Sequence, residues 1–122
     1  MISGYANLDL DFQYIKENDH LILPETIWQK IKQREIIVIR DGGQTFGWLR
    51  FGFFWDLIPI MNLLALEEPY RRKGFGSQLV SFWENEMKRL GYTSVMTTTL
   101  ADEDAQHFYR KLGMVQKSKE LD

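Results

Sequence analysis

The sequence of 122 residues is 44% hydrophobic and 26% charged, a length and balance that predict one packed domain, residues 1–122, and exclude a disordered or multidomain chain. The formal net charge of −2 provides no overall positive field, so we expect neither nucleic acid nor a membrane surface as a partner. Because the chain has no cysteine and only two histidines, a disulfide framework, a cysteine nucleophile and a zinc site are excluded, and we expect no metal.

The N-terminal segment predicts a cytoplasmic protein that begins with a strand. Residues Met1 to Asp11 are polar and acidic and lack the basic start and apolar run of a signal peptide. From Leu8 to Tyr14 apolar and polar residues alternate strictly, which is the period of a half-buried strand.

The middle of the chain predicts a short helix followed by an antiparallel meander. Pro24 begins a segment with apolar residues at helical spacing, and proline is favoured in the first turn of a helix. Residues 36–40 and 45–54 are β-rich, and the Gly-Gly pair between them allows the positive φ of a tight hairpin. Residues 58–66 are apolar almost throughout, so they predict a third strand that is central and covered on both faces.

The second half of the chain predicts a strand–helix–strand crossover. Residues 75–90 carry a helical apolar stripe that ends before Gly91, and a β-branched run follows at 94–99. The strands that flank such a helix pair in parallel. Asp102 is placed to cap a last helix, and 114–117 form a final short strand. The expected class is α/β (mixed α+β), with an antiparallel meander, then a βαβ unit, and helices on both faces of a mixed sheet.

The segment 71–77, Arg-Arg-Lys-Gly-Phe-Gly-Ser, lies where the buried strand gives way to the long helix. Free backbone amides, the helix dipole and basic side chains together favour a phosphate at this point. A solvated basic turn is the alternative, and the strand-to-helix context favours the anion site. A dinucleotide-binding Rossmann motif would need glycine where Leu79 stands, and a P-loop would need Gly-Lys-Ser/Thr.

Two sequence blocks resemble one known family. The block Arg71-Arg72-Lys73-Gly74-Phe75-Gly76, after Glu68-Pro69-Tyr70, is similar to the Arg/Gln-x-x-Gly-x-Gly/Ala acyl-CoA signature of the GNAT superfamily of N-acetyltransferases. The block from Asp102 to Met114 is similar to the family's Asn-x-x-Ala-x-x-x-Tyr-x-x-x-Gly-Phe segment and lies at the expected distance. The resemblance covers about residues 36–115 and implies a GNAT-like fold. It also implies transfer of an acetyl group from acetyl-CoA, by direct attack, to a primary amine of a small-molecule or peptide acceptor.

The resemblance also implies which residues bind and react. The cofactor would be acetyl-CoA as acyl donor, with its pyrophosphate on the amides of Arg72, Lys73, Gly74, Phe75, Gly76 and Ser77 and with Arg71 closing one side. Its pantetheine arm would pair with the strand backbone at Leu64, Ala65 and Leu66. Tyr109 corresponds to the tyrosine that protonates the departing thiolate, and a packed core tyrosine is the alternative.

The sequence departs from the family pattern at several points. Asp102 replaces the family's asparagine, so it is either a weakened nucleotide contact or, as we favour, a helix cap. Asn62 is the only polar side chain in 58–66, so no general base is assigned. The C-terminus is shortened, and residues 117–120 read as a solvated tail, which leaves one acceptor wall missing or supplied by a homodimer. A non-catalytic acyl-CoA-binding or partner-binding module therefore remains the alternative function.

The role of Tyr109 can be tested by Tyr109→Phe, which keeps the ring and removes the hydroxyl proton. If Tyr109 is the general acid, turnover falls by about 10²–10⁴-fold, while affinity for acetyl-CoA persists. For a core tyrosine, the same change would cost about 1 kcal/mol of stability and leave the rate nearly unchanged. Steady-state kinetics and calorimetric binding measure both quantities. Equal turnover in the two proteins would contradict the catalytic assignment.

Overall fold

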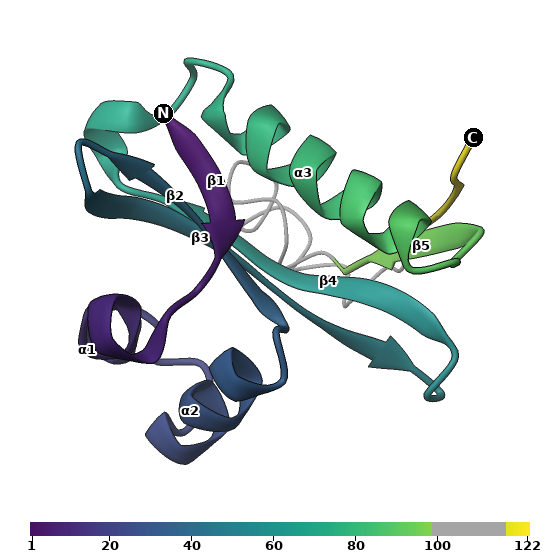
Figure 1. Cartoon of the computed structure of the whole chain (residues 1–122), viewed down its shortest axis with the longest axis horizontal. Helices are drawn as coiled ribbons and strands as arrows, with labels where there is room; N and C mark the ends of the chain where they lie inside the picture. The colour runs from purple at the N-terminus through teal and green to yellow at the C-terminus, as the bar shows by residue number, and fades with distance from the viewer. Residues whose placement is uncertain (99–116) are drawn as a thin grey trace, which may run out of the picture.

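The computed structural model describes residues 1–98 and 117–122, which form a six-stranded mixed sheet with strand order β1-β2-β3-β4-β5-β6 (Figure 1). The strands are β1 (Ile2–Tyr5), β2 (Ile36–Asp41), β3 (Gln44–Phe54), β4 (Ile58–Leu66), β5 (Ser94–Thr97) and β6 (Lys117–Glu120). The helices are α1 (Leu8–Asn18), α2 (Pro24–Lys32), the 3₁₀ helix η1 (Glu68–Tyr70) and α3 (Phe75–Arg89). Among the described strands only β4 and β5 pair in parallel, across the α3 crossover, and the other neighbours are antiparallel. The predicted meander and βαβ unit are therefore confirmed.

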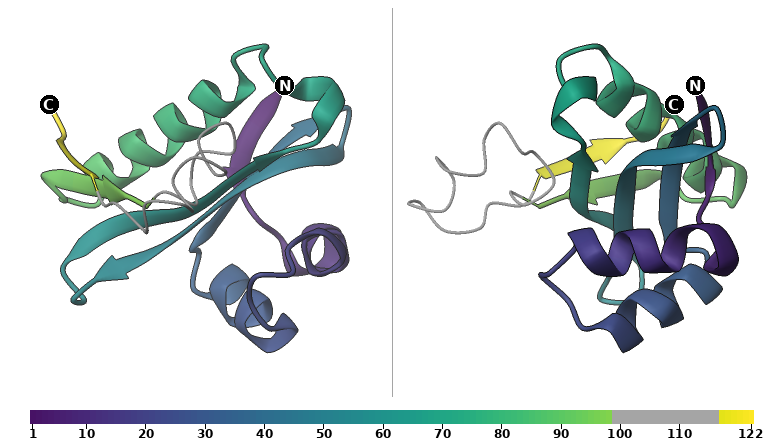
Figure 2. Two further views of the ribbon diagram at one scale, coloured as in Figure 1. Left: turned by 180° about the vertical axis from the view of Figure 1, so that it is seen from behind. Right: turned by 90° about the vertical axis from the view of Figure 1, so that its left-hand side faces the viewer.

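Helices cover both faces of the sheet, as predicted, with α1 and α2 on one face and α3 on the other (Figures 1 and 2). Strand β2 shows why, because successive side chains of a strand point to opposite faces. Ile36 and Val38 pack in the cluster with α1 and α2, whereas Ile37 and Ile39 pack in the cluster with α3. All four are fully buried. No helix in the described ranges is long and apolar enough to cross a membrane.

The prediction of a strand over residues 8–14 is wrong, because these residues begin helix α1. The Asn7 side chain accepts hydrogen bonds from the backbone amides of Asp9 and Leu10, at 2.8 and 3.2 Å, and so caps the helix. The alternating pattern does not match burial, since Leu10, at an apolar position, is 65% exposed and Asp11, at a polar position, is fully buried. The actual first strand, β1, has only four residues, too few for alternation to identify it.

The C-terminal residues 117–120 are not a solvated tail but strand β6, which pairs antiparallel with β5. The free edge of β5 supplies the hydrogen-bond partners that make a strand of this polar segment. Lysines suit such an outer strand because they discourage pairing with another chain. The Nζ atom of Lys119 also lies 3.0 Å from Oε1 of Glu84 on α3. The predicted last helix with its Asp102 cap, and the 114–116 part of the predicted final strand, lie outside the described residues.

A buried carboxylate ties α1 to the sheet. Asp11 is fully buried, and its Oδ2 accepts a hydrogen bond from the Asn7 amide at 2.7 Å. Its Oδ1 accepts from the Thr45 hydroxyl at 2.6 Å, and the Arg40 guanidinium pairs with Oδ2. Such a carboxylate is stabilised only while all of its donors are present.

We therefore expect Asp11→Ala to lower the free energy of unfolding by about 3–5 kcal/mol, because it leaves the Arg40 charge without its buried partner. Urea denaturation measures this loss. The control is Asp9→Ala, which removes an exposed carboxylate from the same first turn and should change stability by less than about 1 kcal/mol. Equal losses in the two variants would show that the Asp11 network does not anchor α1.

Candidate active site

The site begins where β4 and β5 separate. Arg50 of β3 lies opposite Leu63, and Phe51 lies opposite Met61, so Asn62 is an extra residue in β4 and forms a β-bulge. Strand β5 pairs with β4 only at Ile60 and Met61. Beyond the bulge, no described strand pairs with the outer edge of β4, which leaves backbone groups of this edge open to a ligand.

A hydrogen bond at the end of β4 shows which backbone groups of this strand face the open edge. The Glu67 amide donates to the Phe46 carbonyl of β3 at 2.9 Å. Because the backbone groups of a strand alternate between its two sides, those of Ala65 point towards β3 and those of Leu64 and Leu66 point to the open edge. The Leu66 carbonyl accepts a hydrogen bond there from Nε of Arg71, at 3.0 Å.

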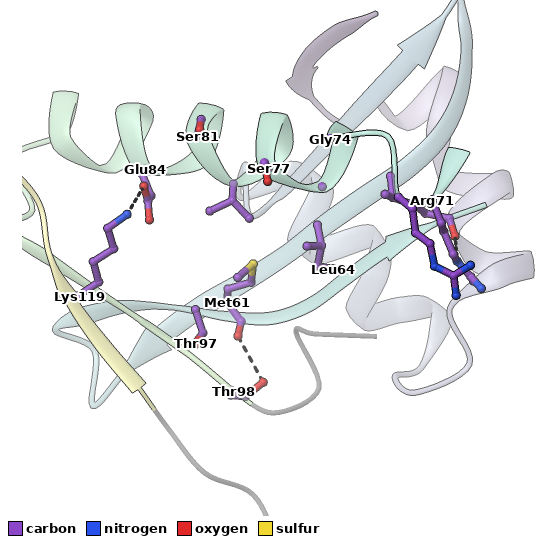
Figure 3. A pocket seen from close by; sticks show the side chains of 14 residues that line it. Met61, Leu64, Arg71, Gly74, Ser77, Ser81, Glu84, Thr97, Thr98 and Lys119 are labelled. Carbon is purple, nitrogen blue, oxygen red and sulfur yellow. Dashed lines mark hydrogen bonds and ion pairs between the residues drawn. The ribbon is translucent and has the colours of Figure 1, made fainter. Parts of the chain in front are cut away.

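A groove with a volume of about 630 Å³ runs along this edge beneath α3, and we call it the β4–α3 groove (Figure 3). Apolar side chains of β4 and polar side chains of α3, β5 and β6 face each other across it. Its lining residues are Met61, Leu64, Leu66, Arg71, Arg72, Gly74, Gly76, Ser77, Val80, Ser81, Glu84, Thr97, Thr98 and Lys119. The volume lies within the roughly 300–1,000 Å³ of small-molecule and cofactor sites.

One end of the β4–α3 groove is the loop that starts α3. Arg72 and Gly74 have φ angles of 62° and 87°, so both residues adopt the left-handed conformation that lets successive amides point into one concavity. An added Cβ at Gly74 would meet nothing within 4 Å, so the backbone conformation and not lack of space requires this glycine. The first turn of α3 contains no acidic residue. The loop therefore places free helix amides and basic side chains at one end of the groove, an arrangement that favours an anion.

Gly76 fits the helix closely against the sheet. An added Cβ there would lie 3.5 Å from Cδ2 of Leu64 and 3.7 Å from Cδ1 of Leu66. These are ordinary van der Waals distances, so a methyl group fits and a larger side chain would fill the space between α3 and β4.

The residues that the sequence singled out take different positions. Seven of them line the β4–α3 groove: Leu64, Leu66, Arg71, Arg72, Gly74, Gly76 and Ser77. Ala65 packs instead in the cluster beneath α1 and α2, and the Phe75 ring lies edge-on to Phe46 at 5.2 Å. Lys73 does not line the groove. Asp102 and Tyr109 lie outside the described residues.

Sequence reasoning missed several lining residues. Ser81 and Glu84 follow Ser77 at spacings of four and seven, which places them on one helix face. This polar stripe, next to the apolar stripe of α3, could have identified these residues as lining a groove. Lys119, whose Nζ approaches the Glu84 carboxylate, gave no sequence signal because its position depends on the pairing of β6 with β5.

Comparisons with known proteins agree with this geometry. The family model described as Acetyltransferase (GNAT) family matches residues 4–114, more of the N-terminal part than the two blocks implied. Among curated proteins, no match was found.

Solved structures share the fold at low sequence identity. Ard1 from Thermoplasma volcanium has a TM-score of 0.77 and 15% identity, over 99% of this chain and 97% of that one. The ribosomal-protein-S18-alanine N-acetyltransferase from Escherichia coli has a TM-score of 0.71 and 14% identity, over 99% and 94%. The aminoglycoside 6'-N-acetyltransferase from Enterococcus faecium has a TM-score of 0.71 and 15% identity, over 100% and 98%. With a family model matched over most of its length, the chain belongs to the GNAT family of acetyltransferases, enzymes that transfer acetyl groups.

Proposed function

We propose that this chain is an acetyl-CoA-dependent N-acetyltransferase, acting as one domain over residues 1–122, that acetylates a primary amine by direct attack. The observation that carries the proposal is the continuity of two features in one groove. The open edge of β4 and the loop at the start of α3, with its arginines, line the same groove. Structural neighbours named for acetylating a protein alanine and an aminoglycoside support an acceptor that is either a peptide or a small molecule.

The residues at the α3 end fit a pyrophosphate. The amides of residues 72–77 would hold it, because the left-handed backbone at Arg72 and Gly74 and the open space at Gly74 allow close approach. Arg71 and Arg72 would add positive charge at the same end of the groove. When bound, acetyl-CoA supplies an acyl group activated as a thioester.

The residues of β4 fit an extended arm that carries amide groups. Leu64 and Leu66 direct backbone groups to the open edge, so we assign pairing with pantetheine to these two residues, whereas the Ala65 backbone serves β3. A backbone amide at this edge would also polarise the thioester carbonyl. The amine nitrogen forms a bond to the carbonyl carbon and loses a proton to water, the carbon–sulfur bond breaks, and the sulfur takes up a proton that we assign to the Tyr109 hydroxyl.

The proposal predicts that acetyl-CoA binds in the β4–α3 groove and raises the melting temperature, because it binds only the folded protein. Gly76→Val should weaken this binding at least tenfold, since the branched side chain fills the space beside Leu64. Isothermal titration calorimetry measures the affinity, and thiol release with a panel of amines measures transfer.

The matched control is Gly4→Val, at a position in β1 where an added Cβ meets nothing within 4 Å and valine suits the strand. Its affinity for acetyl-CoA should equal that of the wild type. If millimolar acetyl-CoA gave no heat of binding and no thermal shift, the proposed cofactor would be refuted. Binding without transfer to any amine would instead favour a non-catalytic acyl-CoA-binding module.

A further inference from the structure

A buried hydroxyl lies where β4 and β5 separate. Thr98 directly follows β5, is 6% exposed and lines the β4–α3 groove. Its Oγ1 lies 3.3 Å from the Met61 carbonyl oxygen, a contact drawn in Figure 3, and 3.4 Å from the carbonyl oxygen of Asn62. The hydroxyl is therefore beside the bulge of β4, at the point where the open edge of this strand begins.

The hydrogen bonds of this hydroxyl are long and partly redundant. An O–H···O hydrogen bond usually measures about 2.5–3.0 Å, and a hydroxyl has one hydrogen to donate. The Met61 carbonyl also accepts a hydrogen bond from the Thr98 backbone amide, at 3.0 Å. The hydroxyl can therefore turn to a better acceptor in the groove without leaving the Met61 carbonyl unpaired.

The proposed path of pantetheine brings its thioester end to this hydroxyl. Leu66 and Leu64 direct backbone groups to the open edge, and residues two apart in a strand are separated by about 7 Å. The two amide groups of pantetheine are joined through two methylene groups, which is a comparable length. With the phosphates at the start of α3, these amides would pair at Leu66 and then Leu64. The two further methylene groups that lead to the sulfur would then lie beside Asn62, next to Thr98.

The surroundings of Thr98 suit a donor to a carbonyl oxygen. Burial strengthens a hydrogen bond, because little water competes for the donor. Among the described residues that line the groove, Glu84 is the only acidic one, and its Oε1 lies 3.0 Å from Nζ of Lys119. This charge is therefore offset within the protein. Unlike a titrating group, a threonine hydroxyl also keeps its proton at any ordinary pH.

We propose that Thr98 is a further catalytic residue, whose hydroxyl donates a hydrogen bond to the thioester carbonyl oxygen of the acyl donor. The proposal rests on the proposed function and deepens it, because it adds a side-chain donor to the backbone amide of β4. As the amine nitrogen attacks the carbonyl carbon, an electron pair moves to the carbonyl oxygen. The Thr98 hydroxyl stabilises this negative charge without giving up its proton, and the electron pair returns when the carbon–sulfur bond breaks. Such a donor acts on the rate more than on binding.

The test is Thr98→Val, which removes the hydroxyl and keeps the shape of the side chain. We expect kcat to fall about 10²-fold, while the calorimetric affinity for acetyl-CoA changes less than about twofold. Thr98→Ser keeps the hydroxyl and should restore most of kcat. Infrared difference spectroscopy with acetyl-CoA labelled with ¹³C at the thioester carbonyl gives a second measurement. The carbonyl band should lie at lower frequency in wild type and Thr98→Ser than in Thr98→Val, because a hydrogen bond weakens the C=O bond.

The matched control is Thr93→Val, the same substitution at an exposed position before β5 and outside the groove, which should leave kcat and the carbonyl band unchanged. If Thr98→Val does not fold, Thr98→Ala allows the same comparison without an added methyl group. A Thr98 that only stabilised the bulge would instead weaken acetyl-CoA binding and leave the carbonyl band in place.

Equal carbonyl frequencies in wild type and Thr98→Val would overturn the assignment of Thr98, as would equal kcat values. The infrared measurement needs binding and no turnover, so it decides this assignment even if no amine is acetylated. Failure of the wild type to bind acetyl-CoA would refute the proposed function and the role of Thr98 together. Binding with an unshifted band would overturn the role of Thr98 alone.

Discussion

The whole site depends on one extra residue in β4. Asn62 has no counterpart in β3, and a bulge of this kind bends its strand and increases the local twist. Strand β5 follows β4 up to Met61 and no further. Backbone N–H and C=O groups need partners, and among the described strands none pairs with the edge of β4 that the bulge releases, so this edge can offer its groups to a ligand.

A second requirement is a costly backbone conformation at the loop before α3. Arg72 is not glycine, yet it has a φ angle of 62°, which costs on the order of 1–2 kcal/mol relative to ordinary helical backbone. Gly74 adopts a similar conformation without a side-chain penalty. Backbone strain of this kind concentrates at ligand-binding loops. Here it accompanies the turn of the chain from the end of β4 into α3, at residues that line the β4–α3 groove.

The sequence predicted elements whose signal is local and strong. β4 is an apolar run, α3 carries a full helical stripe, and the paired glycines at 42 and 43 require a turn. α1 was missed because alternation competed with the Asn7 cap and the buried Asp11, whose partners Arg40 and Thr45 are about thirty residues away. The hydrogen bond between Tyr14 and Glu67 could not be predicted at all. Tyr14 and Glu67 are separated by 53 positions and meet only because α1 packs beside the end of β4.

The charges around the end of β4 come from a short stretch of chain. Arg71 lines the hollows on both sides of β4, Arg72 lines the β4–α3 groove, and Glu67 lies on the α1 side. In the β4–α3 groove the Glu84 carboxylate is offset by Lys119, whose Nζ lies 3.0 Å from Oε1. The two arginines therefore dominate the charge at the start of α3, and a positive charge beside free helix amides favours an anion there, in agreement with the pyrophosphate position that we propose.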